Sequence, residues 1–155
     1  YVIVRPTNNY GIGQYVEKLI PKSCKYLKLG KKIPLHNAGT PIRNWLHAED
    51  TAAAIITIIE SGVKNEIYNI SGDYEQKNIS TVNQIIRLFF EKVGTVENIK
   101  ELIADHVDLS FDRIGQDVRY AIDDSKLKKL GWKPKQVFWK QLPKIVNYYK
   151  ENFVW

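Results

Sequence analysis

The chain opens on three consecutive apolar residues, Val2 to Val4, which are flanked by Tyr1 and Arg5 and followed by Pro6. A continuous apolar run of this length predicts a short strand over Tyr1–Arg5 that is covered on both faces, as the strands of parallel α/β sheets are. The next segment, Thr7–Gly13, is rich in Asn and Gly and predicts a loop of tight turns. The first residues therefore favour a fold in which helices cover a parallel sheet.

Helical and extended apolar patterns alternate along the rest of the chain, so the fold class is α/β or α+β. The expected strands are Ile33–His36, Asn44–His47, Ile67–Ile70 and Arg119–Ile122, and Ser71–Asn78 is expected to be a polar loop. Five helices are expected. The first begins around Glu17 to Leu19 and ends near Gly30, the second is buried at Ala52–Ile59, and the third is capped by Ser80 and ends at Gly94. The fourth is short, at Ser125–Leu130, and the last is amphipathic, at Phe138–Phe153.

The composition is that of one globular domain. The 155 residues, 44% of them hydrophobic, suffice for one compact core without disulfides. The single cysteine, Cys24, lies in an apolar-periodic stretch, which favours a structural residue in a reducing, cytosolic setting over a reactive thiol. No apolar run approaches the roughly 20 residues that span a bilayer, so no membrane partner is expected. The sequence contains no Met, even at position 1, which indicates a fragment or a processed chain.

The formal net charge of +6 brings nucleic acid into consideration as a partner. The positive residues are spread along the chain, however, and their densest group surrounds a helix end, where the helix dipole favours cations. A solvated basic surface is therefore favoured over a nucleic-acid face, and a small anionic ligand also suits this balance. The lysines of the densest group are Lys126, Lys128, Lys129, Lys133 and Lys135.

Residue types that often carry metal binding or acid–base chemistry favour plainer roles in this sequence. His36 and His47 are not at metal-ligand spacing with Cys or carboxylate residues, so no metal is predicted. The carboxylate pairs Glu49/Asp50 and Asp123/Asp124 are typical of helix starts, where the dipole favours acidic side chains. Three tryptophans are expected to pack in the core rather than to stack on a ligand: Trp45, Trp132 and Trp139.

Four blocks that occur in order over essentially the whole chain carry a resemblance to a known superfamily. Arg5–Gly11, which reads RPTNNYG, resembles the strand-to-loop signature of the extended short-chain dehydrogenases. The stretch from Pro34 to Asp50 resembles their pattern of a Pro-led turn followed by Arg, an aromatic residue and Asp. Tyr68–Gly72 resembles their Tyr-Asn-Ile-Gly strand, and Leu130–Pro134 resembles their Leu-Gly-Trp-x-Pro.

Two further blocks narrow the resemblance to the nucleoside-diphosphate-glucose (dTDP- or UDP-glucose) 4,6-dehydratases. Glu17–Pro21 is identical to the EKLIP of that family, and Asp112–Asp123 (DRIGQDVRYAID) resembles its D-R-P-G-H-D-x-R-Y-x-I-D. Within the second block, Ile114 and Gln116 replace the usual Pro and His.

Two departures lie near the middle of the Pro34 block. Asn37 precedes Ala38 where a Gly is common in the family. His36 stands where thymidine-type enzymes often carry Tyr. Uridine-type enzymes, such as those of plant rhamnose synthesis, are closer to the His form, which leans the expected nucleotide slightly towards uridine.

The resemblance implies a fold and an activity. Residues 1–15 would form the last part of an NAD-binding Rossmann domain with its active-site loop. Residues 16–155 would form mainly the smaller α/β sugar-nucleotide-binding domain, with a segment at about 44–62 packing back on the Rossmann sheet. The family enzymes are expected to be cytoplasmic homodimers that use bound NAD to convert dTDP- or UDP-glucose to the 4-keto-6-deoxy sugar.

The residues that perform this chemistry are expected outside the chain. It has neither a Tyr-x-x-x-Lys pair nor a complete Gly-rich dinucleotide loop, so the catalytic residues are expected upstream of Tyr1 and the chain alone is expected to be inactive. The strand at Tyr1–Arg5 would then lack its sheet neighbours and expose apolar surface. We therefore expect low stability for the chain alone, which a cooperative melt at high temperature would contradict.

The resemblance assigns the phosphate grip to positively charged and amide side chains. Arg43 and Arg113 are the candidate diphosphate and ribose contacts, because Arg presents a planar fork of donors that fits phosphate oxygens in pairs. Asn78 supplies an amide nearby. Lys18 is placed at a helix start, where the dipole disfavours a cation, and this independently indicates a local anion. An isolated Arg more often forms a surface salt bridge, which is the plainer interpretation of both arginines.

The other candidates would orient the sugar, the base and the cofactor. Asn8 would touch the substrate and Asn9 the nicotinamide end of NAD, although both suit turn positions equally well. Leu19, Pro34 and His36 would line the pyrimidine and ribose pocket, and Gln116 completes the candidate substrate-binding residues.

Two other functions stay open. A related NAD-dependent 4-epimerase or decarboxylase shares the general blocks, and its reaction product would distinguish it. A non-catalytic module that binds nucleotide sugars or nucleic acid is the alternative of another class. Tight DNA binding with a steep salt dependence would favour a nucleic-acid module, because phosphate contacts release counterions.

Overall fold

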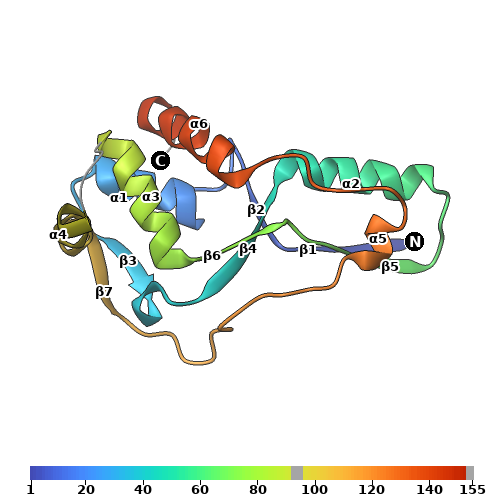
Figure 1. Cartoon of the computed structure of the whole chain (residues 1–155), viewed down its shortest axis with the longest axis horizontal. Coiled ribbons are helices and arrows are strands. Elements are labelled where there is room, and N and C mark those ends of the chain that lie inside the picture. The colour runs from blue at the N-terminus through green and yellow to red at the C-terminus, as the bar shows by residue number, and fades with distance from the viewer. Residues whose placement is uncertain (92–95, 153–155) are drawn as a thin grey trace.

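The structure is a computed structural model that describes residues 1–91 and 96–152, and it has the α/β composition predicted from the sequence (Figure 1). Its strands are β1 (Val2–Pro6), β2 (Asn8–Tyr10), β3 (Ile33–His36), β4 (Ile42–His47), β5 (Glu66–Ile70), β6 (Tyr74–Lys77) and β7 (Val107–Phe111). Its helices are α1 (Leu19–Lys28), α2 (Ala48–Glu60), α3 (Asn78–Phe90), α4 (Val96–His106), α5 (Ser125–Lys128) and α6 (Phe138–Glu151), with a 3-10 turn at Asn37–Gly39.

The strands form three small sheets. β1 pairs with β5 in parallel, with Val4 opposite Tyr68. In the middle sheet β4 pairs in parallel with β2 and antiparallel with β6. β3 and β7 form the third sheet, also parallel. Parallel pairing requires a crossover connection between the paired strands, and helices supply part of each one.

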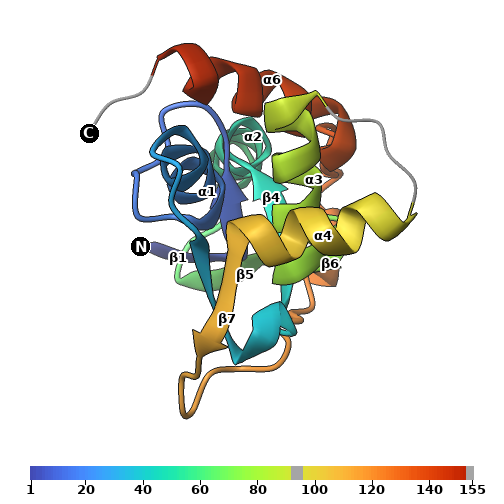
Figure 2. The same cartoon turned by 90° about the vertical axis from the view of Figure 1, so that its left-hand side faces the viewer.

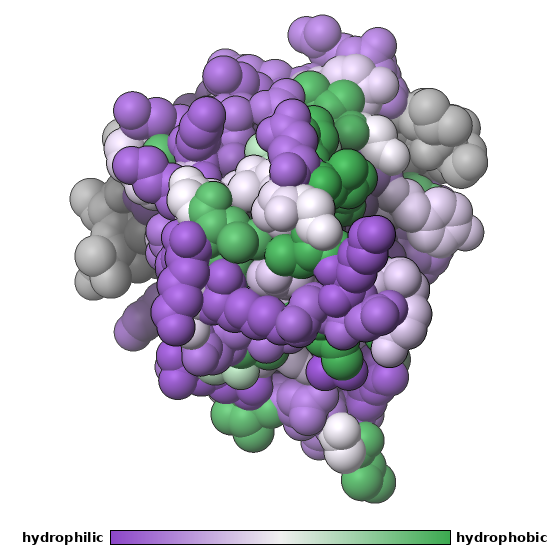
Figure 3. All heavy atoms as spheres, turned by 90° about the vertical axis from the view of Figure 1, so that its right-hand side faces the viewer, coloured by the Kyte–Doolittle hydropathy of each residue, from purple (hydrophilic) through white to green (hydrophobic). Residues whose placement is uncertain are grey.

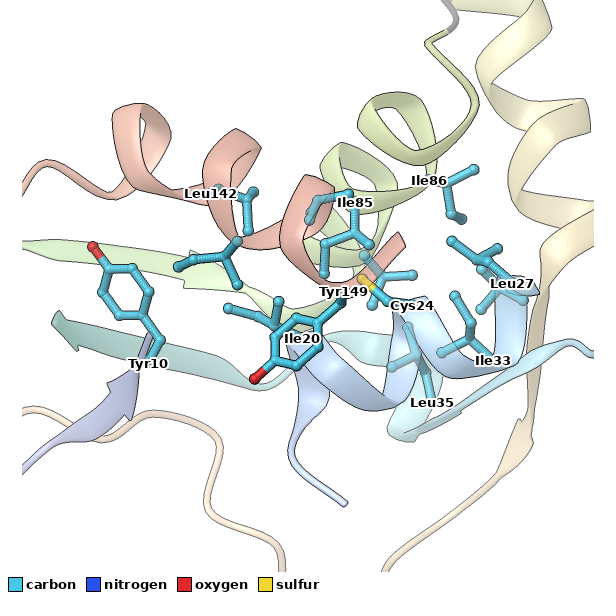
Figure 4. Packing of buried hydrophobic residues seen from close by; sticks show 14 of the residues in the cluster. Tyr10, Ile20, Cys24, Leu27, Ile33, Leu35, Ile85, Ile86, Leu142 and Tyr149 are labelled. Atoms are coloured by element: carbon cyan, nitrogen blue, oxygen red, sulfur yellow. The ribbon is translucent and has the colours of Figure 1, made fainter. Parts of the chain in front are cut away.

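The larger hydrophobic core lies between α1, α3 and α6 at one end of the molecule, and we call it the closed core (Figure 2). Apolar residues at helical spacing on each helix point into it, so the three amphipathic faces cover one another. Figure 4 shows these side chains interleaved around Cys24. Its fully buried members include Ile20, Cys24, Val82, Ile85, Ile86 and Val146, all with 0% exposure.

A second cluster, which we call the open core, joins β1, β5, α2 and α5 at the other end (Figure 1). Its buried members are Leu46, Ala54, Ile58, Tyr68, Ile70, Leu127 and Trp132, with Val4 packed against them. The layer is covered incompletely, and exposed apolar side chains remain on β1, α2 and β5, including Ile3, Ile56, Ile59 and Ile67. Figure 3 views this end of the molecule and shows hydrophobic side chains gathered on it.

Two buried polar groups connect the elements around the junction of these cores. Asn44 of β4 donates to the carbonyl oxygen of Gly72 (2.7 Å), and its Oδ1 accepts from the Gly72 amide (2.8 Å) and from the Thr7 hydroxyl (2.9 Å). The Asp50 carboxylate accepts from the backbone amides of Lys135 (2.9 Å) and Gln136 (3.0 Å). Because buried polar groups are stable only when they are hydrogen-bonded, these contacts fix how β4, α2 and the segment before α6 meet.

Several local predictions were wrong, each because tertiary contacts outweighed the local pattern. The predicted loops Thr7–Gly13 and Ser71–Asn78 contain the short strands β2 and β6, which pair with β4. The predicted strand Arg119–Ile122 is reduced to a single bridge between Ile42 and Arg119. Ser80 does not cap α3, because the helix begins at Asn78 with Lys77 as its N-cap.

Burial differs from prediction at three places. β1 and α2 were both predicted to be buried. Each exposes apolar side chains on one face, because no described element covers that face. Trp45 and Trp132 lie in the core as predicted, but Trp139 on α6 is 60% exposed. The predicted helix ends at Gly94 and Phe153 lie outside the described residues.

Candidate functional site

A cavity of about 450 Å³, lined by both polar and apolar side chains, lies where β1 ends, β2 begins and α1 begins. Four residues that were predicted separately as ligand contacts meet in its wall: Asn8, Asn9, Lys18 and Leu19. The carboxyl ends of parallel strands are where open α/β sheets place their ligands, and the cavity lies at the carboxyl end of β1, which is parallel to β5. The other lining residues are Pro6, Thr7, Gln14, Trp45 and Tyr120.

Asn9 is held in place from several sides, whereas Asn8 is exposed to the cavity. The Asn9 amide oxygen accepts from the Thr51 hydroxyl (2.5 Å), and its Nδ2 donates to the Thr7 carbonyl oxygen (3.1 Å). Gln14 donates to the Asn9 backbone carbonyl at 2.6 Å. Asn9 therefore fixes the loop that forms one wall, and Asn8 presents an amide to a ligand.

Lys18 is the N-cap residue of α1, as the sequence predicted for the helix start. Its backbone is extended (φ −81°, ψ 154°), and its side chain makes no capping hydrogen bond. No carboxylate in the described part of the chain pairs with it, since the nearby Glu17 is 3.8 Å from Lys22 instead. The exposed ammonium therefore adds to the positive field of the helix N-terminus, which favours an anion at this side of the cavity.

Arg43 lies behind the cavity wall, buried on β4. Its Nη1 donates to the backbone carbonyl oxygens of Ile42 (2.8 Å) and Asp117 (3.1 Å). Its guanidinium carbon lies 4.9 Å from the centroid of the Tyr120 ring, a cation–π distance. Arg43 is thus positioned by backbone groups and an aromatic face, and it forms no salt bridge with any described carboxylate.

Arg113 and Asp117 also act on Tyr120. A hydrogen bond from the Tyr120 hydroxyl to the Asp117 carboxylate raises the pKa of Tyr120, and the charges of Arg43 and Arg113 oppose this rise. The hydroxyl therefore lies within the field of both guanidinium groups. The segment that carries Arg113, Asp117 and Tyr120 has no regular structure and runs from the end of β7 towards α5 (Figure 1). It is attached to β4 by the Ile42 amide, which donates to the Val118 carbonyl oxygen at 2.8 Å.

The remaining predicted contacts lie outside the cavity lining. Pro34 and His36 lie on β3, where the His36 ring is 6.1 Å from that of Phe111. Asn78 begins α3, and its amide donates to the Pro41 carbonyl oxygen at 3.0 Å. The side-chain oxygens of Asn78 and Gln116 are buried without a hydrogen-bond partner in the described chain. Buried acceptors without a partner are costly, and a bound ligand could supply the missing donors.

Tyr120, Thr7 and Gln14 were not predicted as site residues from the sequence. Thr7 and Gln14 are in short polar stretches, where nothing local separates a ligand contact from a turn residue. Tyr120 had a usable signature, because it is an aromatic residue next to Arg119 in a polar segment of the dehydratase-like block. Its contact with Arg43 depends on the tertiary structure, which packs the Tyr120 ring against the Arg43 guanidinium.

Other reactive groups in the described residues have structural environments. Cys24 is buried, and desolvation raises the pKa of its thiol to about 12. Glu49 and Asp50 lie in the first turn of α2, as predicted for helix starts. Within residues 1–91 and 96–152, no three His, Cys, Asp or Glu side chains gather as a metal site would require. The helices of the same residues are too short or too polar to cross a bilayer.

Known proteins resemble this chain over most of its length. Residues 1–71 match the model of the NAD dependent epimerase/dehydratase family. A dTDP-glucose 4,6-dehydratase of Escherichia coli is 39% identical over 99% of this chain and 43% of its own length. The human dTDP-D-glucose 4,6-dehydratase is 37% identical over 98% of this chain and 42% of its own length. The chain thus spans about two fifths of these relatives.

Solved structures agree with the sequence relatives. The dTDP-glucose 4,6-dehydratase of Bacillus anthracis, determined in complex with NAD, superimposes with a TM-score of 0.81 at 37% identity, covering 97% of this chain and 45% of that one. The UDP-glucuronic acid 4-epimerase of Bacillus cereus superimposes with a TM-score of 0.78 at 20% identity, covering 98% and 46%. At that identity the epimerase shows a shared fold alone. The predicted extended short-chain dehydrogenase fold is confirmed by these matches.

Proposed function

We propose that this chain, which is a homologue of the dTDP-glucose 4,6-dehydratases over 99% of its residues, forms the nucleotide-sugar-binding part of such an enzyme. The observation that carries the proposal is the Arg43 guanidinium packed on the ring of Tyr120, which lines the same cavity as Lys18. The charge of Arg113 also acts on the Tyr120 hydroxyl. Identity of 37–39% with dehydratases, against 20% with a 4-epimerase of the same fold, favours dehydration over epimerisation.

The arrangement suits a diphosphate between a sugar and a nucleoside. Arg43 uses one nitrogen for backbone carbonyls, which leaves other donors of its fork for phosphate oxygens. Arg113 and Lys18 add charge from two other segments. None of the three cations forms a salt bridge with a described carboxylate, and the Asp117 carboxylate is engaged by the Tyr120 hydroxyl. A diphosphate would replace the missing counter-charge, with Asn78 and Gln116 accepting from hydroxyl groups of the ligand.

The proposed reaction converts dTDP-glucose to the 4-keto-6-deoxy sugar. NAD, when bound, supplies the hydride acceptor and donor of this conversion. The residues present fit its nicotinamide end, because the Asn9 wall is fixed by Thr51 and Gln14 just beyond the carboxyl end of the parallel strand β1. Asn8 and Asn9 would orient the sugar against that ring, and the proton-transferring residues would come from the remainder of the protein. On this proposal the chain alone is inactive.

The same proposal accounts for the organisation of the molecule. Residues 1–15 and 44–62 would belong with the Rossmann side of the enzyme, and most of residues 16–155 would form the substrate domain. The relatives named above act on dTDP-glucose, so we propose a thymidine nucleotide in place of the uridine nucleotide that His36 favoured. A homodimer in a reducing, cytoplasmic setting completes the proposal, in agreement with the single buried Cys24.

The test uses the protein as encoded in its gene, with NAD and dTDP-glucose. We expect the 4-keto-6-deoxy product, and we expect Arg43→Lys to raise KM by about 10- to 100-fold, because Lys keeps the charge but loses the planar fork. Arg87→Lys on α3 is the matched control and should leave KM unchanged. Formation of a C4 epimer instead of the keto sugar would contradict the proposal. DNA binding with a steep salt dependence and no nucleotide binding would also contradict it.

A further inference from the structure

The turn between β3 and β4 has an unusual backbone. Asn37, Ala38 and Gly39 all adopt left-handed conformations, with φ of 51°, 51° and 68°. Asn is among the non-glycine residues that tolerate this region best. Thr40 closes the turn, because its amide (3.0 Å) and hydroxyl (2.8 Å) both donate to the Asn37 carbonyl oxygen. The turn therefore holds the Asn37 side chain in a fixed direction.

That side chain binds a segment 76 residues away. The Arg113 amide donates to Asn37 Oδ1 at 2.7 Å, and Asn37 Nδ2 donates to the Arg113 carbonyl oxygen at 3.3 Å. Within the described chain, no other side-chain hydrogen bond joins residues 112–116 to another segment. The next attachment is at Asp117 and Val118, on β4. Asn37 thus determines where the irregular segment passes on its way from β7 to Arg43.

The turn also fixes the beginning of α3. A Cβ atom on Gly39 would lie 2.8 Å from the Ile79 Cβ, so the turn and the helix are in close contact. The Asn78 amide donates to the Pro41 carbonyl oxygen at the end of the same turn. The turn is therefore in contact with the two polypeptide segments that carry Asn78 and Arg113.

We propose that Asn37 is a positioning residue for substrate, and that its two-way hydrogen bond to the Arg113 backbone holds that guanidinium beside Tyr120 and Arg43 where it meets the diphosphate. This inference rests on the proposed function. A Gly at position 37 would allow the same backbone conformation but would leave residues 112–116 without their attachment. The Asn side chain thus supplies a contact that Gly would lack.

The experiment compares three single variants and one double variant of the protein as encoded, assayed with NAD and dTDP-glucose. Asn37→Gly keeps the left-handed turn and removes the side chain. We expect its KM and its dissociation constant for dTDP to rise about tenfold with kcat unchanged, since a uniform binding interaction is lost. Asn65→Gly is the matched control, because Asn65 is also left-handed (φ 57°) but lies before β5, and it should change neither constant by more than about twofold.

The second arm separates positioning from general stability. In an Arg113→Ala background, Asn37→Gly should have no further effect on dTDP affinity, since the group it positions is absent. An equal loss in that background would overturn the inference, as would an Asn37→Gly variant that binds like the wild type. Failure of the unmodified protein to bind dTDP would overturn the proposed function, and this inference with it. Wild-type binding that Asn37→Gly leaves intact would overturn the inference alone.

Discussion

The closed core and the open core use the same kinds of side chain but differ in what covers them. In the closed core, Ile85 and Ile86 of α3 have no exposed surface, because α1 and α6 pack on that helix. In the open core, α2 packs Ala54 and Ile58 inward, while Ile56 and Ile59 are 54% and 70% exposed on its outer side. Apolar side chains of α2 therefore lie on more than one side of the helix, and the described chain covers one of these sides.

The difference shows what an apolar run can and cannot predict. It predicts that a helix or strand is to be covered, but it does not identify the part of a protein that covers it. Monomeric proteins rarely expose a contiguous apolar patch larger than a few hundred Å² without a binding role. On the proposed function, the rest of the enzyme covers the outer faces of β1 and α2. The closed core, in contrast, stabilises the substrate domain without contacts from the rest of the enzyme.

The largest expected effect comes from the junction between the two cores. A Cβ atom on Gly72 would lie 1.9 Å from the Trp45 carbonyl oxygen, so Gly72→Ala forces β4 away from the β5–β6 connection. The Asn44 hydrogen bonds to Gly72 would be lost as well. We expect a loss of at least about 4 kcal/mol in the free energy of unfolding, which few domains tolerate. Urea unfolding followed by circular dichroism measures it.

The control for Gly72→Ala is Gly62→Ala. Gly62 has a positive φ of 69° and open space around its position, so only backbone strain, about 1 kcal/mol, is expected there. Equal effects of the two substitutions would show that the close approach at Gly72 is not what joins the two cores.

A smaller effect compares the two cores directly, through the loss in free energy of unfolding that one Ile→Ala substitution causes in each. Ile85→Ala leaves a cavity in the closed core and should cost about 3 kcal/mol in the free energy of unfolding of the 155-residue chain. Ile59→Ala on the open face should cost less than about 0.5 kcal/mol, because little apolar surface of that side chain is buried. Urea midpoints of the two variants test the contrast, and similar losses would mean that the open face is covered in solution.

The same contrast explains how much of the fold could be predicted from the sequence. Helices α1 and α6 and strands β3 and β5 are set by their own apolar patterns and were predicted nearly as they occur. β2 and β6 read Asn-Asn-Tyr and Tyr-Glu-Gln-Lys, with few of the residues that favour strands. They become strands because β2 and β6 pair with the two edges of β4. The local sequence of β2 or β6 gives no sign of this pairing.

The site was predictable where residues are close in sequence and not where segments meet. Asn8, Asn9, Lys18 and Leu19 lie within 12 residues of one another along the chain and line one cavity. Arg43, Arg113 and Tyr120 were brought together by an irregular segment held at Asn37 and Val118. The resemblance supplied the two arginines but not Tyr120, since a ring that packs on a guanidinium leaves no local periodicity in the sequence.

The last prediction concerns Cys24, inside the closed core, whose titration should change the free energy of unfolding at high pH and have the smallest effect at neutral pH. Burial raises the pKa of this thiol from 9.0 to about 12, so the folded state keeps the proton that the unfolded chain releases. The corresponding stability is fully present below pH 9 and is lost as pH rises towards about 12. At about pH 10.5 the loss should approach about 2 kcal/mol.

Urea unfolding of the wild type and of Cys24→Ala at about pH 8 and about pH 10.5 measures this loss. Other groups titrate alike in both proteins, so the wild type should lose about 2 kcal/mol more than the variant between the two pH values. Cys24 should also resist alkylation until the chain unfolds, because the thiolate is the reactive form, whereas Ile59→Cys on the open face should react at once. Equal pH dependence, together with fast alkylation of Cys24, would show that the closed core opens to solvent in the folded protein.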